Sequence, residues 1–299
     1  MRIVFMGTPE FAVPSLQILI ENHYNVVAVV TATDKPSGRG KKVQESAVKK
    51  FAKQHQIPVL QPEKLKSPEF IEKLASYKAD LQVVVAFRML PEVVWKMPPL
   101  GTFNLHASLL PNYRGAAPIN WAIINGETIT GVTTFFVRHE IDTGDIILQE
   151  SEPIFPDDDA GSLHDRLMVK GAQLVLKTVQ MIQKGNVVTV PQSFSSDLKT
   201  APKIFKETCQ LDFQKEASYL VNFVRGLSPV PGAWTTFLGH HLKVFRAEVS
   251  YRTILEDFCT DKKTFLEFKT ARHALRLLDV QLEGKRRMNI EEFLRGFRF

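Results

Sequence analysis

Short apolar runs alternate with longer amphipathic segments through the first 190 residues. The strand candidates are Arg2–Gly7, Val26–Thr31, Pro58–Leu60, Leu81–Ala86, Gly101–His106 and Thr130–Val137. The helix candidates are Phe11–Glu21, Gln44–His55, Pro68–Ser76 and Ala160–Lys184. Leu81–Ala86 is almost continuously apolar, which is typical of a parallel strand with helices on both faces. The alternation predicts an α/β fold with a doubly wound, mostly parallel sheet of Rossmann-like type over residues 1–190.

The pattern changes after residue 190. A polar stretch rich in Ser and Asp, Pro191–Pro202, predicts a linker over residues 191–205. Beyond it, Leu211–Leu227 has a helical pattern. The strand-like segments that follow, separated by turns, are Ala233–Phe237, Leu242–Val249, Thr264–Phe268 and Leu275–Leu282. We therefore expect a second, β-rich domain over residues 206–299, a small β-barrel of OB-like type.

Composition excludes several classes of protein. The chain is 44% apolar and 23% charged, which is ordinary for a globular protein and atypical of a disordered one. No apolar run approaches the roughly 20 residues of a membrane span, and the first residues lack the pattern of a signal peptide. Cys209 and Cys259 have no CxxC spacing, so neither a zinc site nor a disulfide framework is expected, and a reducing cytoplasm fits.

Positive charge is concentrated in the last third of the chain. The formal net charge of the whole chain is +6, and residues 201–299 hold 17 Lys and Arg against 12 Asp and Glu. Such a basic module suits a polyanionic partner. A solvated, lysine-rich surface would have the same composition, so charge alone leaves both interpretations open.

The predicted loop Ala32–Val43 carries a second group of cations, Arg39, Lys41 and Lys42, together with two glycines. Glycine and cations are what a mobile loop needs to meet a phosphate backbone, although an ordinary solvated loop has the same features. The loop lacks the GxxxxGK[ST] spacing of a nucleotide-binding loop. The turn Gly7–Phe11 likewise lacks the GxGxxG fingerprint of a dinucleotide site.

Two polar residues mark the end of the strand candidate Gly101–His106. Asn104 and His106 are two positions apart, so the period of a strand puts both side chains on one face. An amide beside an imidazole can bind and polarise a carbonyl, although a lone strand-end histidine is more often structural. A working histidine also needs a carboxylate, and the segment Arg138–Asp145 offers Asp142 in a turn context. Asp142 could orient this histidine or only stabilise its own turn, and the sequence leaves both open.

Segments spread over the whole chain carry a resemblance to a known family. They are Met6–Ala12, Gly38–Lys42, Asn104–His106, Ser108–Ile119, Asp142–Asp145, Pro231–Trp234, Gln281–Met288 and Phe293–Gly296. Together they resemble the methionyl-tRNA formyltransferases. The resemblance implies transfer of a formyl group from 10-formyltetrahydrofolate to the α-amine of methionyl initiator tRNA, for translation initiation, with no metal.

The resemblance also implies roles for individual residues. The residues implied in catalysis are Asn104, His106 and Asp142. Those implied in folate binding are Phe87, Arg88, Met89, Leu90, Ser108, Leu109, Leu110 and Pro111, and those implied in tRNA binding are Arg39, Lys41 and Lys42. One segment departs from the family, whose pterin-side loop usually has the sequence Ala-Tyr-Gly-x-Ile-Leu-Pro. Here the loop is the shorter Ala86–Pro91, which lacks the glycine and gains Arg88.

Two other functions fit parts of this pattern. A formyltransferase acting on an amino-sugar nucleotide would share the catalytic residues but would not need the basic loop and basic module. A non-catalytic nucleic-acid-binding protein would use the α/β domain only as a scaffold. The presence of Asn104, His106 and Asp142 argues against it. We expect methionyl initiator tRNA and the folate co-substrate as partners, no membrane partner, and a monomeric cytoplasmic protein.

Overall fold

The computed structural model describes residues 1–37, 42–193 and 195–299, and it divides into two compact units. The first unit comprises Met1–Gly115, Gly131–Glu152 and His164–Lys199, and the second comprises Ala116–Thr130, Pro153–Leu163 and Thr200–Phe299. The two stretches Ala116–Thr130 and Pro153–Leu163 therefore group with the later residues. The sequence predicts a different division, with one domain at 1–190, a linker at 191–205 and a second domain at 206–299. These domain boundaries stay a prediction.

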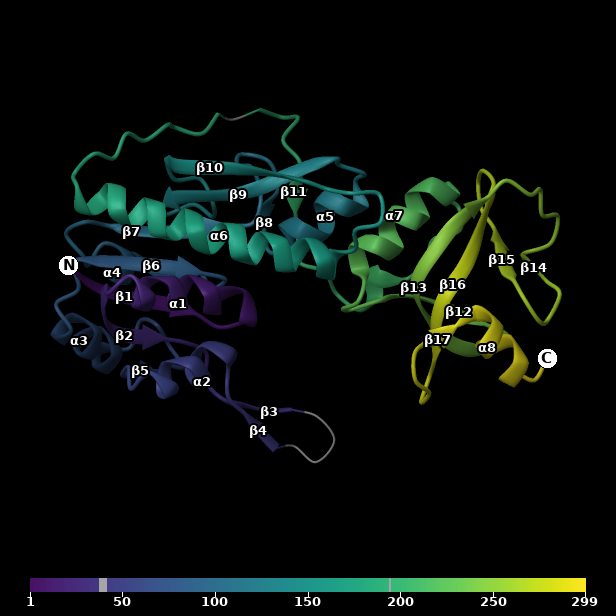
Figure 1. Cartoon of the computed structure of the whole chain (residues 1–299), viewed down its shortest axis with the longest axis horizontal. Coiled ribbons are helices and arrows are strands. Elements are labelled where there is room, and N and C mark those ends of the chain that lie inside the picture. Colours follow the sequence, from purple (N-terminus) through teal and green to yellow (C-terminus); the bar gives the residue numbers. More distant parts are fainter. Residues whose placement is uncertain (38–41, 194) are drawn as a thin grey trace. The chain divides into compact units, whose positions relative to one another are not determined.

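A mixed sheet forms the first unit (Figure 1). Its strand order is β10-β9-β7-β6-β1-β2-β5. The strands are β1 (Arg2–Gly7), β2 (Asn25–Val30), β5 (Val59–Leu60), β6 (Leu81–Val85), β7 (Thr102–His106), β9 (Ile129–Phe136) and β10 (Ile146–Pro153). Strands β5, β2, β1, β6 and β7 pair in parallel, and β9 pairs with β7 in the antiparallel direction. The predicted Rossmann-like, mostly parallel sheet is confirmed.

The helices of this sheet begin where the sequence supplies caps. They are η1 (Glu10–Ala12), α1 (Val13–Glu21), α2 (Ala47–Gln54), α3 (Pro68–Ser76), α4 (Glu92–Trp95) and α6 (Ala160–Gln183). The Ser46 and Ser67 hydroxyls accept hydrogen bonds from the third residue of α2 and α3. The cap explains why α2 begins at Ala47 and not at Gln44 as the sequence pattern suggested.

Two short strands, β3 (Lys35–Ser37) and β4 (Lys42–Gln44), pair in the antiparallel direction. They lie in the predicted loop Ala32–Val43, apart from Gln44, which the sequence pattern assigned to the next helix. Among the residues with described positions, no helix is long and apolar enough to cross a membrane.

Helix α6 packs on one face of the sheet, and the candidate site lies on the other. Gly171 of α6 lies so close to Leu105 that an added Cβ would come within 2.7 Å of its side chain. Thr178 of the same helix hydrogen-bonds Thr134 of β9 at 2.8 Å. Because side chains alternate along a strand, Asn104 and His106 point to the face opposite Leu105. On that opposite face, Val84, the register partner of Asn104, belongs to a buried cluster that also includes residues of α3 and α4.

The second unit is built on an antiparallel, curled sheet with the order β12-β13-β16-β15-β14, and β17 pairs with β16. Its strands are β12 (Ala233–Phe237), β13 (His240–Ser250), β14 (Phe258–Thr260), β15 (Leu266–Lys269), β16 (Ala274–Leu282) and β17 (Met288–Asn289). Its helices are α5 (Pro118–Ile124), η2 (Glu207–Cys209), α7 (Ala217–Leu227) and α8 (Ile290–Gly296). Two further short strands, β8 (Arg114–Gly115) and β11 (Thr200–Ala201), pair with each other. The half-barrel form of this sheet is consistent with the predicted OB-like fold.

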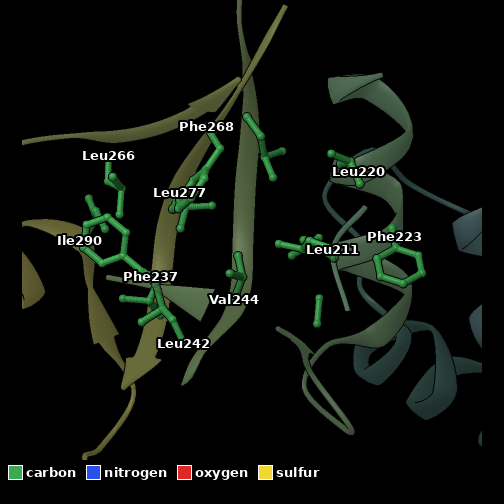
Figure 2. Close-up of a cluster of buried hydrophobic side chains, with 14 of the residues drawn as sticks. Leu211, Leu220, Phe223, Phe237, Leu242, Val244, Leu266, Phe268, Leu277 and Ile290 are labelled. Atoms are coloured by element: carbon green, nitrogen blue, oxygen red, sulfur yellow. The ribbon is translucent and has the colours of Figure 1, made fainter. Parts of the chain in front are cut away.

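A single cluster of buried side chains holds this unit together, as Figure 2 shows. Phe237 of β12 lies among residues of β15, β16 and α8, and Leu220 and Phe223 of α7 contribute to the same cluster. Helix α7 is shorter than the predicted segment Leu211–Leu227. Leu211 donates its N–H to Trp234 of β12 at 2.8 Å, which keeps it extended, so the helix begins only at Ala217.

Candidate active site

Three neighbouring parallel strands end at the same edge of the first sheet. Strands β1, β6 and β7 end at Gly7, Val85 and His106, and the loops that follow them share that edge. In open α/β sheets this edge is where ligands usually bind. An added Cβ at Gly7 would lie 2.7 Å from the Ala12 side chain, so only glycine fits where the chain turns from β1 into the first helix.

His106 is a buried residue held through its ring. It is 6% exposed, and its Nε2 lies 2.8 Å from the Tyr113 carbonyl oxygen. A carbonyl oxygen can only accept, so Nε2 carries the hydrogen and donates it. The other ring nitrogen, Nδ1, carries no hydrogen when the ring is neutral, and it lies on the side of a second residue, Asp142.

Asn104 lies on the same face of β7 as His106. It is only half-buried, and its side-chain amide makes no hydrogen bond to any other residue that the structure describes. Its two N–H groups and its oxygen are therefore available to a bound molecule.

Asp142 is brought to the histidine from a distant part of the chain. Its Oδ2 lies 3.7 Å from His106 Nδ1, and the two side chains are 15% and 7% exposed. This distance is too long for a direct hydrogen bond but within the range of an ion pair with a charged ring. Oδ2 also accepts a 3.0 Å hydrogen bond from the Gly115 N–H. The carboxylate therefore binds a loop that lies 27 positions away in sequence, which goes beyond a local turn.

The loop after β7 is rigid because its polar groups are paired. The Ser108 hydroxyl donates to the Asn112 carbonyl at 2.7 Å, and the Thr133 hydroxyl donates to the Ser108 carbonyl at 2.6 Å. Of the loop residues implied in folate binding, Ser108 and Leu110 are buried, whereas Leu109 and Pro111 are partly exposed. The two buried side chains stabilise the loop, and the two others lie nearer the solvent.

The shortened loop after β6 is tied down by its own arginine. The Arg88 guanidinium donates to the Glu63 carbonyl at 2.9 Å and to the Pro62 carbonyl, and it stacks over the Phe87 ring. Leu90 is buried, and Met89 is 63% exposed. Arg88 thus anchors the loop to the segment after β5.

The basic loop can be described only in part. Arg39 and Lys41 lie outside the described residues, and Lys42 is the first residue of β4, where its backbone pairs with Ser37. The implied role of these residues in tRNA binding stays a prediction. No cluster of three or more metal-ligating side chains occurs in the part of the chain with described positions.

Sequence reasoning missed two residues of this site. Gln192, within the predicted linker, hydrogen-bonds Arg114 and the backbone of Asp142. Arg114 belongs to the family-like segment Ser108–Ile119, but the sequence assigns it no role of its own. An isolated glutamine in a polar stretch carries no local signal, because its partners are 50 and 78 positions away in sequence.

The sequence matches two family models. Residues 1–179 match the model described as formyl transferase, and residues 203–298 match the model described as formyl transferase, C-terminal domain. The fold, the candidate site and these matches agree, and the chain belongs to the formyl transferase family.

Its relatives within the family are more specific. The methionyl-tRNA formyltransferase of Bacteroides fragilis is 53% identical over 308 residues, covering 99% of this chain and 95% of that protein. The methionyl-tRNA formyltransferase of Flavobacterium johnsoniae is 50% identical over 307 residues, covering 100% of this chain and 97% of that protein. The resemblance drawn from the sequence motifs is confirmed.

Solved structures show the same fold at lower identity. An N-formyltransferase from Helicobacter canadensis, in complex with folinic acid and dTDP-3-aminofucose, has a TM-score of 0.67 at 20% identity, covering 92% of this chain and 97% of that one. HypX from Aquifex aeolicus, in complex with tetrahydrofolic acid, has a TM-score of 0.65 at 21% identity, covering 99% of this chain and 48% of that one. At this level of identity the likeness concerns the fold alone.

Proposed function

We propose that this protein transfers a formyl group from 10-formyltetrahydrofolate to the α-amine of methionyl initiator tRNA, for translation initiation in the cytoplasm. The observation that carries the proposal is the identity of 50–53% with methionyl-tRNA formyltransferases over nearly the whole of both chains. A relative that shared only the α/β domain would support formyl transfer but not the tRNA acceptor.

The geometry of the candidate site supports this chemistry. When the amine attacks the formyl carbon, negative charge develops on the formyl oxygen, and preorganised donors there lower the barrier. Asn104 would donate an amide N–H to that oxygen, since its amide has no other partner among the described residues. Because Nε2 donates to the Tyr113 carbonyl, Nδ1 of His106 would accept the proton released by the attacking amine, and once protonated it would supply a second donor.

Asp142 would support His106 and not touch the formyl group. Its carboxylate, 3.7 Å from Nδ1, would attract the positive charge that develops on the ring during the transfer, and it helps to orient the ring. The Tyr113 carbonyl holds the ring from the opposite side through Nε2. Between these two oxygens the imidazole has one orientation, which is what a group acting on a developing charge requires.

The side chains at this edge suit a folate. Met89 and Ile141 are apolar and 63% and 60% exposed. Met89 belongs to the loop after β6, and Ile141 belongs to the loop that carries Asp142. Exposed apolar side chains beside a ligand site can cover a flat aromatic ring. The bound folate supplies the activated formyl group, and Arg88, tied to residues 62 and 63, keeps the first loop in place.

We propose that two basic regions hold the tRNA. Arg39, Lys41 and Lys42 would contact its acceptor end, and the module 206–299 would bind the body of the tRNA. The excess of 17 Lys and Arg over 12 Asp and Glu in residues 201–299 supports the second assignment.

An acceptor assay tests the proposed function. The protein is mixed with 10-formyltetrahydrofolate and offered methionyl initiator tRNA in one reaction and an amino-sugar nucleotide in another. We expect the formyl group on the methionine only. Formylation of the sugar amine would refute the acceptor, and transfer to neither would refute the function.

A further inference from the structure

A buried glutamine joins both loops of the candidate site. Gln192 is 6% exposed. Its Nε2 donates to the carbonyl oxygens of Asp142 at 2.9 Å and Gly144 at 2.7 Å. Its Oε1 accepts from Nε of Arg114 at 3.1 Å and from Nη2 at 2.6 Å. Carbonyl oxygens only accept and a guanidinium only donates, so a single orientation of the amide satisfies all four contacts.

The backbone that Gln192 binds is not in a relaxed conformation. Asp142 has a φ of +55°, in the left-handed region that residues other than glycine rarely adopt. A residue in this conformation is strained, and the conformation persists only where the surroundings hold it. Gly144 lies so close to β9 that an added Cβ would be 1.6 Å from the Phe136 carbonyl oxygen. The two Nε2 hydrogen bonds span this stretch, from the strained Asp142 to the buried Gly144.

Arg114 connects the same glutamine to the histidine loop. Three consecutive residues each bind one part of the site: the Tyr113 carbonyl accepts from His106, the Arg114 side chain donates to Gln192, and the Gly115 N–H donates to Asp142. The pKa of Arg114 is lowered by burial, a cost that the Asp142 carboxylate partly offsets. The contacts therefore form a ring. The Asp142 carbonyl binds Gln192, Gln192 binds Arg114, and the next residue, Gly115, donates its N–H to the Asp142 carboxylate.

The segment that carries Gln192 is fixed at both ends. Val190 exchanges two backbone hydrogen bonds with Ile146 at the start of β10, at 2.8 and 2.9 Å. The Lys199 carbonyl accepts from the Tyr113 N–H at 2.6 Å. Val190, two residues before Gln192, is therefore paired with the start of β10, and Lys199 is bonded to the loop that carries Arg114.

We propose that Gln192 is a positioning residue for the transfer reaction: with Arg114, it holds Asp142 in the strained conformation that places the carboxylate beside His106. This assignment rests on the proposed function. It predicts that loss of the two Nε2 donors releases Asp142, so that turnover falls while substrates still bind.

The test compares two buried glutamines. Gln192→Met keeps the length of the side chain and removes its hydrogen bonds. Gln192→Glu keeps the acceptor for Arg114 but turns oxygens toward the carbonyls of Asp142 and Gly144. The matched control is Gln82→Met, because Gln82 is fully buried in β6 of the same sheet, away from the catalytic edge, and accepts from the Thr102 hydroxyl.

We expect kcat to fall about 10- to 100-fold in both Gln192 variants, the size of loss that follows misplacement of a reacting group by about 1 Å. The KM values for the folate and for methionyl-tRNA should stay unchanged. Gln82→Met should lower thermal stability with little change in kcat. Hydrogen exchange of the Gly115 amide, which donates to Asp142, should become faster in the Gln192 variants alone.

Each alternative outcome has a separate meaning. An unchanged kcat and an unchanged Gly115 exchange rate in Gln192→Met would overturn the assignment. An equal loss of kcat in Gln82→Met would show that any buried glutamine of this sheet has the same effect, and that Gln192 has only a structural role. If the unchanged protein transferred no formyl group, the proposed function would fail, and the Gly115 exchange rates would still report whether Gln192 holds Asp142.

Discussion

Replacement of Asp142 by asparagine should remove the charge beside His106 and leave the loop intact. The amide oxygen of an asparagine can still accept from the Gly115 N–H, so the 3.0 Å contact to the neighbouring loop is retained. The lost quantity is the attraction between the carboxylate and a charged imidazole 3.7 Å away. For side chains this well buried, such an attraction is about 4 kcal/mol at an effective dielectric constant of about 20. A transition state that carries this charge should be reached about a thousandfold more slowly.

The assay is the initial rate of formyl transfer to methionyl-tRNA at saturating folate. The matched control is Asp145→Asn, three residues further along the same loop, where the carboxylate pairs with an Arg138 side chain that is 58% exposed. Such a surface pair contributes about 1 kcal/mol or less, so the control should retain most of its activity. The reasoning is refuted if Asp142→Asn is as active as Asp145→Asn, or if it loses folding stability and activity together.

Three further outcomes are expected. Asn104→Ala should lower kcat on the order of a hundred- to a thousandfold, the usual loss of one oxyanion donor, with tRNA affinity unchanged in a filter-binding titration. Arg39→Ala should flatten the slope of log affinity for initiator tRNA against log salt by about 1 or less, and identical curves would exclude a phosphate contact. Burial raises the pKa of Glu152, but hydrogen bonds from Lys170 and Arg166 outweigh burial and lower the pKa below its ordinary value of 4.5. The charged Glu152 therefore stabilises the fold above pH 4.5, and this stabilisation is lost as the pH falls through the lowered pKa. In urea titrations, Glu152→Gln should lose less stability on acidification than the unchanged protein.

The parts of the site that follow from local periodicity could be predicted from the sequence. The strand Gly101–His106 was predicted within one residue of β7, and its period alone placed Asn104 and His106 on one face. The predicted face is the one not covered by α6, because Leu105, between the two, packs against Gly171. Hydrophobic alternation records which side of a strand is buried, so it also records which side is free for polar residues.

The approach of Asp142 could not be predicted in the same way. Strand β9 runs antiparallel to β7, so its last residue, Phe136, pairs with Phe103 at the far end of β7. A loop that continued outward from there would move away from His106. The loop instead folds back, since Phe136 donates its N–H to the Asp145 carbonyl at 3.1 Å. Neither the direction of β9 nor this reversal leaves a periodic trace in the sequence.

Backbone contacts explain why the segment Tyr113–Gly115 forms a motif at all. Tyr113 contributes a carbonyl to His106 and Gly115 contributes an N–H to Asp142, so the side chains of these two residues take no part in those bonds. The constraint lies in the backbone conformation, with φ of 62° at Tyr113 and 126° at Gly115. The value at Gly115 is one that only glycine adopts without strain. The motif is therefore largely a requirement of backbone geometry, and Arg114 contributes through its side chain, which donates to Gln192.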